Sequence, residues 1–356
     1  MPDVMRAAVL RAPHVVEVAE VPIPTITNPT DILVRVERTA ICGTDLHPYE
    51  GRLEVEPDIV LGHEFLGTVV ATGDAVGQFS DGDRVVSSCV VSCGSCYQCR
   101  RHQPGNCAGS RIFGLGLALG DLAGGQAEFV VVPNADLTAR RIPEAGIADD
   151  ARFDEDILFA GDIMTTGYEA VARSMRPGDT VAVVGAGPVG LCAAMAASAL
   201  GAGQVIVVDK VDTRLKEAEN QGAITLNADQ VEPADAVLDL TDWRGADVVV
   251  DAVGHESALL SAISLVRAGG TLSIPGVYTE DAITIPFGEL YLKGVKVEMG
   301  VSHITEYMDE VIALTVAGRL RPSSIITHRM GLSEAAEAYR MFEAREATKI
   351  ILDPEN

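Results

Sequence analysis

Four cysteines lie close together in the sequence, with the spacing Cys-x2-Cys-x2-Cys-x7-Cys: Cys93, Cys96, Cys99 and Cys107. Glycine and polar residues surround them, as a loop that wraps around a metal ion requires. Four thiolates complete a tetrahedral shell and leave no position for a substrate, so the spacing predicts a structural zinc site. An iron–sulfur cluster also takes four cysteines and is the alternative. Two disulfides are sterically awkward at such short spacings.

Three other segments offer a thiolate, an imidazole and a carboxylate, which are the ligand types of a catalytic zinc site. Cys42 and His47 lie in the first segment, His63 and Glu64 in the second, and Asp162 in the third. Each has an ordinary structural alternative. A single cysteine is usually a small buried hydrophobic residue, and Asp162 could cap the helix that follows it. Spacing alone does not show that the three segments meet, so a catalytic zinc is at this point a hypothesis.

A glycine-rich turn of the form Gly-x-Gly-x-x-Gly spans residues 185–190, directly after a Val-rich run and at the start of an Ala-rich segment. In this setting Gly185 allows the tight turn, Gly187 lets a pyrophosphate approach the backbone, and Gly190 allows close packing of helix on strand. Asp209 ends the next Val-rich run, where a carboxylate binds the adenosine ribose and repels a 2′-phosphate. The pattern predicts a dinucleotide site that prefers NAD to NADP. A turn that only packs, with Asp209 solvated, is the alternative.

The part of the chain before Asp162 is rich in short Val- and Ile-containing runs that glycine, proline and aspartate separate. This pattern is typical of short strands joined by turns. We therefore expect a compact, barrel-like domain of mostly antiparallel strands. The predicted strands are 32–36, 67–71, 84–86 and 127–132.

Beyond Asp162 the pattern changes to short Val/Ile-rich runs that alternate with Ala-rich segments. Strands that alternate with helices indicate a parallel, doubly wound sheet. Two helical patterns and one last strand, 349–352, follow after residue 300. The predicted strands of the sheet are 180–184, 204–208, 247–250 and 271–274, and the predicted helices are 189–200, 256–266, 307–317 and 333–344.

Length and charge limit the classes of protein to which the chain can belong. Its 356 residues exceed what one hydrophobic core usually serves, so we expect two domains. A formal net charge of −24 disfavours nucleic acids and anionic membranes as partners, since both are negative. The first residues have no apolar run typical of a secretory signal, and the stretch 190–203 is too short to span a bilayer. We expect a cytoplasmic protein that acts on small molecules.

Taken in chain order, these motifs resemble those of the zinc-containing medium-chain alcohol dehydrogenases. The resemblance covers nearly the whole chain and rests on Cys42-Gly-Thr-Asp-x-His47, Gly62-His-Glu64, the four-cysteine loop, Asp162 with Thr165-Thr166-Gly167, and the glycine turn. It implies a GroES-like β-barrel catalytic domain formed by residues 1–163 and 301–356. A Rossmann domain, residues 164–300, is inserted between these two parts, and the active site lies in the cleft.

The resemblance also implies that Cys42, His63 and Asp162 hold the catalytic zinc. Alcohol dehydrogenases use two cysteines and one histidine there, so Asp162 departs from that pattern by replacing a cysteine. The Cys–His–Asp set resembles the bacterial secondary-alcohol and formaldehyde dehydrogenase branches. Glu64 would lie behind the zinc as a transient ligand, and Asp45 would hydrogen-bond His63 and fix its tautomer.

Proton transfer is assigned by the same resemblance to two residues of the first segment. Zinc would act as a Lewis acid on the hydroxyl of an alcohol. The proton would leave through the Thr44 hydroxyl and then reach His47, because a histidine titrates near neutral pH and suits a relay to solvent. Ordinary loop hydrogen bonds are the alternative for both side chains.

Further residues are placed at the cofactor by the resemblance. Val189 would pack behind the nicotinamide ring, and Thr166 would lie near that ring. Lys349 would contact the pyrophosphate and Arg214 the adenosine ribose, with a solvated surface charge as the alternative for both. The remaining residues expected at the dinucleotide are Gly185, Gly187, Pro188, Gly190, Asp209 and Val277.

Together these roles predict a dehydrogenase with two zinc ions per chain that transfers a hydride between NAD and an alcohol, giving an aldehyde or ketone. A polyol or amino-alcohol dehydrogenase, resembling sorbitol or threonine dehydrogenases, is the alternative within this class. A zinc-free quinone or enoyl reductase and a non-catalytic NAD-binding relative are the others. By family position Cys89, Leu53 and Val277 line the substrate pocket, although the sequence identifies no substrate. Relatives are dimers or tetramers, so we expect a homodimer or homotetramer.

Overall fold

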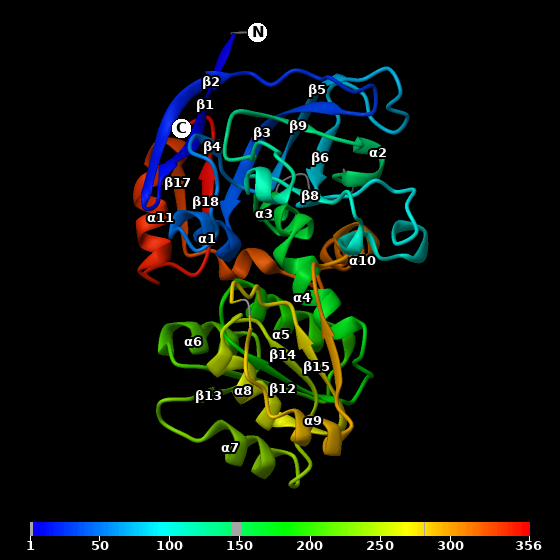
Figure 1. The fold of residues 1–356 in the computed structure, drawn as a ribbon, viewed down its shortest axis with the longest axis vertical. Coiled ribbons are helices and arrows are strands. Elements are labelled where there is room, and N and C mark those ends of the chain that lie inside the picture. The colour runs from blue at the N-terminus through cyan, green and yellow to red at the C-terminus, as the bar shows by residue number, and fades with distance from the viewer. Residues whose placement is uncertain (1–2, 144–150, 281) are drawn as a thin grey trace. The chain divides into compact units, whose positions relative to one another are not determined.

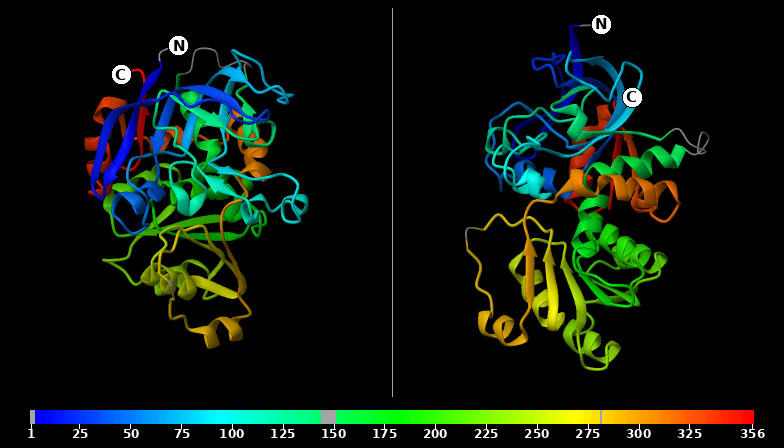
Figure 2. Two further views of the ribbon diagram at one scale, coloured as in Figure 1. Left: turned by 45° about the horizontal axis from the view of Figure 1, so that its top comes forward. Right: turned by 90° about the vertical axis from the view of Figure 1, so that its right-hand side faces the viewer.

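The computed structural model describes residues 3–143, 151–280 and 282–356. Two compact units are formed (Figures 1 and 2): unit 1 contains Met1–Asp162, His303–Gly318 and Pro322–Asn356, and unit 2 contains Ile163–Ser302 and Arg319–Arg321. Expectations that fall on residues 1–2 and 144–150, at the start of the chain and late in the first predicted domain, lie outside the described residues.

Unit 1 is built mainly of antiparallel strands, as its sequence pattern predicts. A central sheet has the order β10-β6-β5-β3-β18-β17, and β9 also pairs with β3. A second sheet has the order β2-β1-β4, and β7 pairs with β8. The strands are β1 (Val4–Ala12), β2 (Val15–Pro22), β3 (Ile32–Ile41), β4 (Ile59–Val60), β5 (Glu64–Thr72), β6 (Arg84–Ser87), β7 (Val90–Val91), β8 (Arg111–Ile112), β9 (Phe129–Val132), β10 (Ala139–Arg141), β17 (His328–Gly331) and β18 (Ile350–Asp353).

Both ends of the chain contribute to unit 1 (Figure 1). The last strand, β18, pairs antiparallel with β3, so that Ile350 lies opposite Ile41. Helix α11 (Ala335–Glu343) covers this region with residues spaced i, i+3, i+4 and i+7, the pattern of one buried helix face. These buried residues are Ala335, Ala338, Tyr339 and Phe342. The other helices of unit 1 are α1 (Leu46–Tyr49), α2 (Ala135–Thr138), α3 (Ala151–Leu158) and α10 (Ile304–Val316).

Unit 2 is a parallel sheet with the order β13-β12-β11-β14-β15-β16. Strand order reverses at β11, as in doubly wound folds that bind dinucleotides. Its strands are β11 (Thr180–Val184), β12 (Gln204–Asp209), β13 (Ile224–Asn227), β14 (Ala246–Asp251), β15 (Val266–Ile274) and β16 (Lys296–Met299). The predicted fold class, a β-barrel-like domain combined with a Rossmann-type sheet, is thereby confirmed.

Helices cover both faces of this sheet because side chains alternate along each strand. Ala182 and Val184 face a core that includes Val237 of α7 and Leu259 of α8. The opposite face packs against α4, α5 and α6, and Figure 2 (right) shows the green helices α4 and α5 beside the strands. The helices are α4 (Ile163–Ala172), α5 (Pro188–Leu200), α6 (Asp212–Asn220), α7 (Pro233–Leu240), α8 (Glu256–Leu265) and α9 (Phe287–Lys293).

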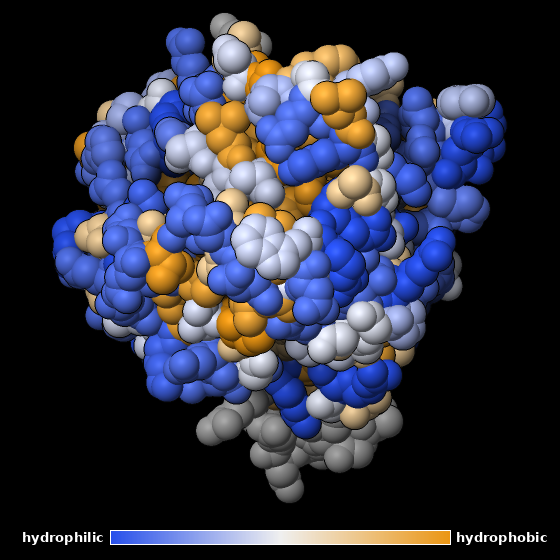
Figure 3. Space-filling view, turned by 90° about the horizontal axis from the view of Figure 1, so that it is seen from below, coloured by the Kyte–Doolittle hydropathy of each residue, from blue (hydrophilic) through white to orange (hydrophobic). Residues whose placement is uncertain are grey.

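The face of the molecule drawn in Figure 3 is mainly hydrophilic, with hydrophobic side chains scattered among polar ones. This surface agrees with the chain's 51 acidic and 27 basic residues. Within the ranges that the structure describes, no helix combines the length and apolarity needed to cross a membrane.

Candidate functional site

The central sheet of unit 1 brings Cys42 and His63 to the same place. β3 and β5 pair antiparallel with Ala40 opposite Glu64. Cys42 follows the end of β3 and His63 precedes the start of β5, so the register alone places the two side chains near each other.

Asp162 reaches this region through a close approach of two backbone segments. The Cys89 N–H donates to the Gly161 carbonyl at 2.8 Å. A Cβ atom on Gly161 would lie 2.1 Å from the Ser87 carbonyl oxygen, so only glycine fits here without displacing that strand end. The contact fixes Asp162 immediately before α4 and beside the end of β6.

The three predicted ligands converge in a buried cluster. One ligand atom each from Cys42, His63 and Asp162 lies within 4.8 Å of the others. His63 Nε2 is 3.3 Å from Asp162 Oδ2. Zinc bonds nitrogen and oxygen at about 2.0–2.2 Å, so a tetrahedral ion would separate these two atoms by about 3.4 Å. The donor set and its spacing therefore fit zinc.

Asp45 lies behind His63 and fixes its orientation. Its Oδ1 is 3.0 Å from His63 Nδ1, and its Oδ2 accepts a 2.9 Å hydrogen bond from the Cys42 N–H. The contact at Nδ1 directs the opposite ring nitrogen, Nε2, toward Asp162. A histidine that binds a metal through one nitrogen commonly has a carboxylate on the other.

Burial and neighbouring charges shift the pKa values of the three ligands. Burial, with a smaller contribution from Asp162, raises the pKa of Cys42 to about 11. Burial alone would raise the pKa of Asp162, but contact with His63 outweighs it and lowers the value to about 2. Burial would lower the pKa of His63, but the charges of Asp45 and Cys42 raise it well above 6.5. A cation at this point would stabilise the thiolate of Cys42.

Glu64 is paired with Lys349, which corrects the expectation for this lysine. Lys349 Nζ donates to the Glu64 carboxylate and, at 2.8 Å, to the Ile41 carbonyl. Both side chains are 0% exposed. The β3–β18 register places Lys349 beside Ile41, and its side chain turns inward because the buried Glu64 charge requires a partner. Lys349 is therefore neither a solvated surface charge nor free to contact a pyrophosphate.

Cys89 contacts a predicted metal ligand directly, a role that the sequence did not reveal. Its thiol donates to Asp162 Oδ1 at 3.4 Å. Burial, followed by the charge of Asp162, raises the pKa of Cys89 well above 9, so the sulfur keeps the proton that it donates. The sequence pointed to Cys89 only as a residue of the substrate pocket, because nothing in its spacing relates it to Asp162.

The predicted proton-relay residues lie on the loop and short helix that follow Cys42. Thr44 Oγ1 is 3.9 Å from the Cys42 sulfur. His47 is a buried residue of α1. Leu53, expected at the substrate pocket, lines a cavity of about 410 Å³ in unit 1 together with Pro48 and Val55.

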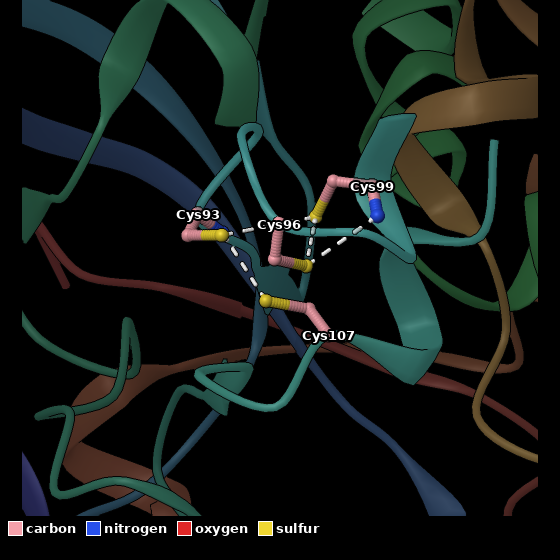
Figure 4. Close-up of side chains that lie close together, drawn as sticks. All are labelled: Cys93, Cys96, Cys99 and Cys107. Atoms are coloured by element: carbon pink, nitrogen blue, oxygen red, sulfur yellow. Dashed lines mark hydrogen bonds between the residues drawn. The ribbon is translucent and has the colours of Figure 1, made fainter. Parts of the chain in front are cut away.

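The four clustered cysteines converge in unit 1, as Figure 4 shows. The Sγ atoms of Cys93 and Cys99 are 4.0 Å apart, and those of Cys96 and Cys99 are 3.5 Å apart. A tetrahedral zinc with bonds of about 2.3 Å would separate its sulfurs by about 3.8 Å, whereas a disulfide needs about 2.05 Å. Backbone N–H groups of Ser95 and Cys96 lower the pKa of Cys93 to about 6, which favours its thiolate. The spacing fits a four-thiolate metal site.

The glycine turn in unit 2 joins β11 to α5. Gly185 has φ +97°, which favours glycine. A Cβ on Gly190 would lie 1.8 Å from the Gly185 carbonyl oxygen, whereas a Cβ on Gly187 would meet no atom within 4 Å. Gly190 is thus needed for close packing, and open space beside Gly187 leaves room for a phosphate at the N-terminus of α5. Pro188 and Val189 begin that helix.

Asp209 joins the end of β12 to the glycine turn. Its Oδ2 accepts a 2.7 Å hydrogen bond from the Ala186 N–H, and its Oδ1 accepts bonds from the Lys210 and Val211 N–H groups at 2.7 and 2.8 Å. These bonds hold the carboxylate at the carboxyl edge of the sheet, where dinucleotides bind in such folds. Three other predicted cofactor residues also lie in unit 2: Thr166 on α4, Arg214 on α6 and Val277 after β15.

Comparison with known proteins identifies two matching family models. The model of the alcohol dehydrogenase GroES-like domain matches residues 28–144, and that of the zinc-binding dehydrogenases matches residues 188–317. A probable zinc-binding alcohol dehydrogenase of Mycobacterium tuberculosis is 37% identical over 97% of this chain and 87% of its own.

Two solved structures share the fold over almost the whole chain. An alcohol dehydrogenase of Thermus sp. ATN1 is similar with a TM-score of 0.93 and 39% identity, covering 98% of this chain and 99% of its own. An alcohol dehydrogenase of Escherichia coli, solved with NADH, has a TM-score of 0.86 and 27% identity, covering 99% of this chain and 100% of its own.

Proposed function

This chain belongs to the zinc-containing medium-chain alcohol dehydrogenase family, and we propose that it oxidises an alcohol to an aldehyde or ketone with NAD as hydride acceptor. It is a zinc-dependent oxidoreductase that uses a nicotinamide cofactor. The alcohol as substrate, NAD rather than NADP, and the residue roles below are parts of the proposal.

The convergence of Cys42, His63 and Asp162 within 4.8 Å carries the proposal. Zinc, when bound, supplies a Lewis acid that makes a hydroxyl group more acidic. Asp162 contributes a carboxylate that is ionised at neutral pH, since contact with His63 lowers its pKa to about 2. Cys89 holds one Asp162 oxygen through its S–H and thereby leaves the other to face His63.

Thr44 and His47 are assigned to proton movement. The Thr44 hydroxyl lies close to the Cys42 sulfur and can accept and pass on a proton without changing its own charge. His47 lies one helical turn further along, and an imidazole titrates in the pH range where such a relay works. Only a group that exchanges protons near neutral pH can hand them to water at a useful rate.

The cofactor preference rests on Asp209. Three backbone N–H groups hold its carboxylate in one position, so it is ordered before the cofactor binds. A fixed carboxylate at the end of the second strand accepts the ribose hydroxyls of NAD and repels the 2′-phosphate of NADP.

The four-cysteine cluster is assigned a second, structural zinc, which gives two zinc ions per chain. Four sulfur ligands complete a tetrahedral shell, so this ion takes no part in the reaction. Thiols that remain available to metals suit a reducing compartment, and we place the protein in the cytoplasm on that ground.

A homo-oligomer is proposed from the edge of the unit 2 sheet. β16 ends the strand order, and Met299 on this strand is 68% exposed. On α9, Tyr291 and Leu292 are 77% and 85% exposed. An exposed strand edge beside large apolar side chains is a liability unless it is covered. A second copy can cover it by pairing the same edge about a two-fold axis, and light scattering measures the resulting mass.

A panel of alcohols tests the proposed reaction. The zinc-loaded protein is mixed with NAD and with primary, secondary or polyhydroxy alcohols, and NADH is followed by its absorbance. NADH formation with simple alcohols supports the proposal, whereas NADH formation with polyhydroxy alcohols alone points to the polyol alternative. No NADH with any member of the panel refutes an alcohol dehydrogenase.

A further inference from the structure

We propose that Gln126 and Tyr339 are positioning residues of the catalytic metal site, because together they hold Asp45 where it orients His63. This inference rests on the proposed zinc site at Cys42, His63 and Asp162. The two residues extend the support of that site to the C-terminal helix α11, which is remote from Asp45 in the sequence.

A continuous chain of polar contacts carries the inference. The Tyr339 hydroxyl donates to Gln126 Oε1 at 2.8 Å. Gln126 Nε2 donates to the Ala40 carbonyl at 3.2 Å and to Asp45 Oδ2 at 3.4 Å. Asp45 Oδ1 is 3.0 Å from His63 Nδ1. Gln126, Tyr339 and Asp45 are each 0% exposed, so water cannot replace any partner in the chain.

The direction of each hydrogen bond follows from the neighbours of Gln126. Its Nε2 faces two acceptors, a backbone carbonyl and a carboxylate, so the amide nitrogen and not the amide oxygen must lie on that side. The amide oxygen then faces Tyr339, whose hydroxyl must donate. Burial, followed by the charge of Asp45, raises the pKa of Tyr339 well above 10, so this proton is retained.

The Gln126 backbone is fixed against the segment that carries His63. Its N–H donates to the Leu61 carbonyl at 2.9 Å, and its carbonyl accepts from the Ala8 N–H at 2.8 Å. A Cβ on Gly62 would lie 2.4 Å from Gln126 Cγ and 2.9 Å from its backbone nitrogen. Gln126 thus contacts the residue before His63 with its backbone and the carboxylate behind His63 with its side chain.

These contacts divide the support of Asp45 between two donors. The Cys42 N–H binds Asp45 Oδ2 at 2.9 Å, and Gln126 Nε2 binds the same oxygen at 3.4 Å. Without Gln126 the carboxylate keeps only the donor on the ligand loop itself, which is free to move when Cys42 moves. The carboxylate and the imidazole then reorient more easily, and the metal should dissociate faster.

The test compares Gln126→Met and Tyr339→Phe with a matched control, Tyr49→Phe. Met approximates the shape of Gln without its donors, and Tyr339→Phe removes a single hydroxyl. Tyr49 is buried in the same core, and its ring centroid is 5.2 Å from that of Tyr339. The Tyr49 change therefore removes a hydroxyl from the same core without touching the chain of contacts.

Two readouts separate positioning from general damage. Zinc release into a chelator is followed over time, with the four-cysteine site as an internal reference in the same chain. The visible spectrum of the protein with Co²⁺ at the catalytic site reports ligand geometry directly. Loss of a partner behind a metal ligand typically weakens metal binding by about 10–100-fold.

We expect Gln126→Met to speed zinc release from the catalytic site by about 10-fold or more, Tyr339→Phe to speed it less, and both to change the cobalt spectrum. Release from the four-cysteine site and all properties of Tyr49→Phe should stay unchanged. Wild-type release and an unchanged spectrum in Tyr339→Phe and in any folded Gln126→Met protein would overturn the inference. If the wild-type protein itself binds no metal at Cys42, His63 and Asp162, the proposed function fails instead.

Discussion

Lys349 and Glu64 form an ion pair that solvent does not reach, immediately next to His63 in the sequence. The Lys349 ammonium also donates to the Ile41 carbonyl and lies 5.2 Å from the centre of the Phe159 ring. Burial would lower the pKa of this lysine, but the Glu64 charge raises it, so the ammonium form persists. The pair fixes Glu64 behind the ligands, where an unpaired carboxylate would disturb their charge balance.

Replacing Lys349 by Met should lower the free energy of unfolding by about 3–5 kcal/mol, because it leaves a buried charge without a partner. Urea denaturation of the purified protein measures this change. Adding Glu64→Gln to Lys349→Met should restore much of the loss. Lys216→Met, which removes an exposed lysine paired with Glu219, is the control and should change little. An equally small effect of Lys349→Met would mean that the buried pair contributes nothing to stability.

Replacing Asp209 by Gly should shift cofactor use toward NADP. The change removes the acceptor for the ribose hydroxyls and the charge that repels a 2′-phosphate, and it also frees the Ala186 N–H in the glycine turn. Hydrogen bonds to a charged group are worth about 1.5–3 kcal/mol, so the NAD-to-NADP ratio of kcat/KM should fall by about 10–100-fold. Asp229→Asn changes an exposed carboxylate paired with Lys210 and is the matched control. An unaltered ratio in Asp209→Gly would contradict the assignment of the ribose site.

Zinc affinity at the catalytic site should rise with pH. Burial raises the pKa of Cys42 to about 11, and His63 also titrates well above 6.5 because Asp45 and Cys42 outweigh its burial. Both groups hold a proton at neutral pH in the metal-free protein, and both must lose it to bind zinc. One to two protons released per ion give a gain of about 10–100-fold per pH unit. Competition with a chelator of known pH dependence, measured at several pH values, checks this; affinity that is flat or falls with pH would contradict it.

Replacing Cys107 by Ala should remove the structural zinc and leave the catalytic site occupied. Cys107 is the most buried of the four cysteines. Because a structural zinc contributes folding energy, the melting temperature should fall by roughly 5 °C or more, and the 93–107 loop should become open to proteases. Calorimetry and limited proteolysis measure these effects. Cys192→Ala, at a buried cysteine of α5, is the control, and a Cys107→Ala protein that keeps its zinc and stability would count against the site.

Local patterns in the sequence predicted much of the fold. The predicted strand 180–184 coincides with β11, and the glycine turn follows it with Gly185 in the left-handed conformation. Such features depend on neighbours in the chain, and the residue types record them directly. The β1–β2 hairpin was not predicted, because charged residues such as Arg6, Glu17 and Glu20 interrupt its apolar runs.

Contacts that depend on sheet register were beyond the reach of sequence spacing. The approach of Cys42 to His63 follows from the pairing of Ala40 with Glu64, which no local pattern encodes. The same limit explains Lys349. Its position suggested a surface charge, whereas the β3–β18 register turns it into the core.

The zinc content and activity of Cys42→Ala, measured beside the wild-type protein, test the central claim most directly. The account predicts two zinc ions per chain and NADH formation from an alcohol for the wild-type protein. For Cys42→Ala it predicts one zinc ion, no NADH and an unchanged circular dichroism spectrum, because the four-cysteine site and the core do not involve this thiol. A Cys42→Ala protein that keeps both zinc ions and forms NADH at the wild-type rate would contradict it.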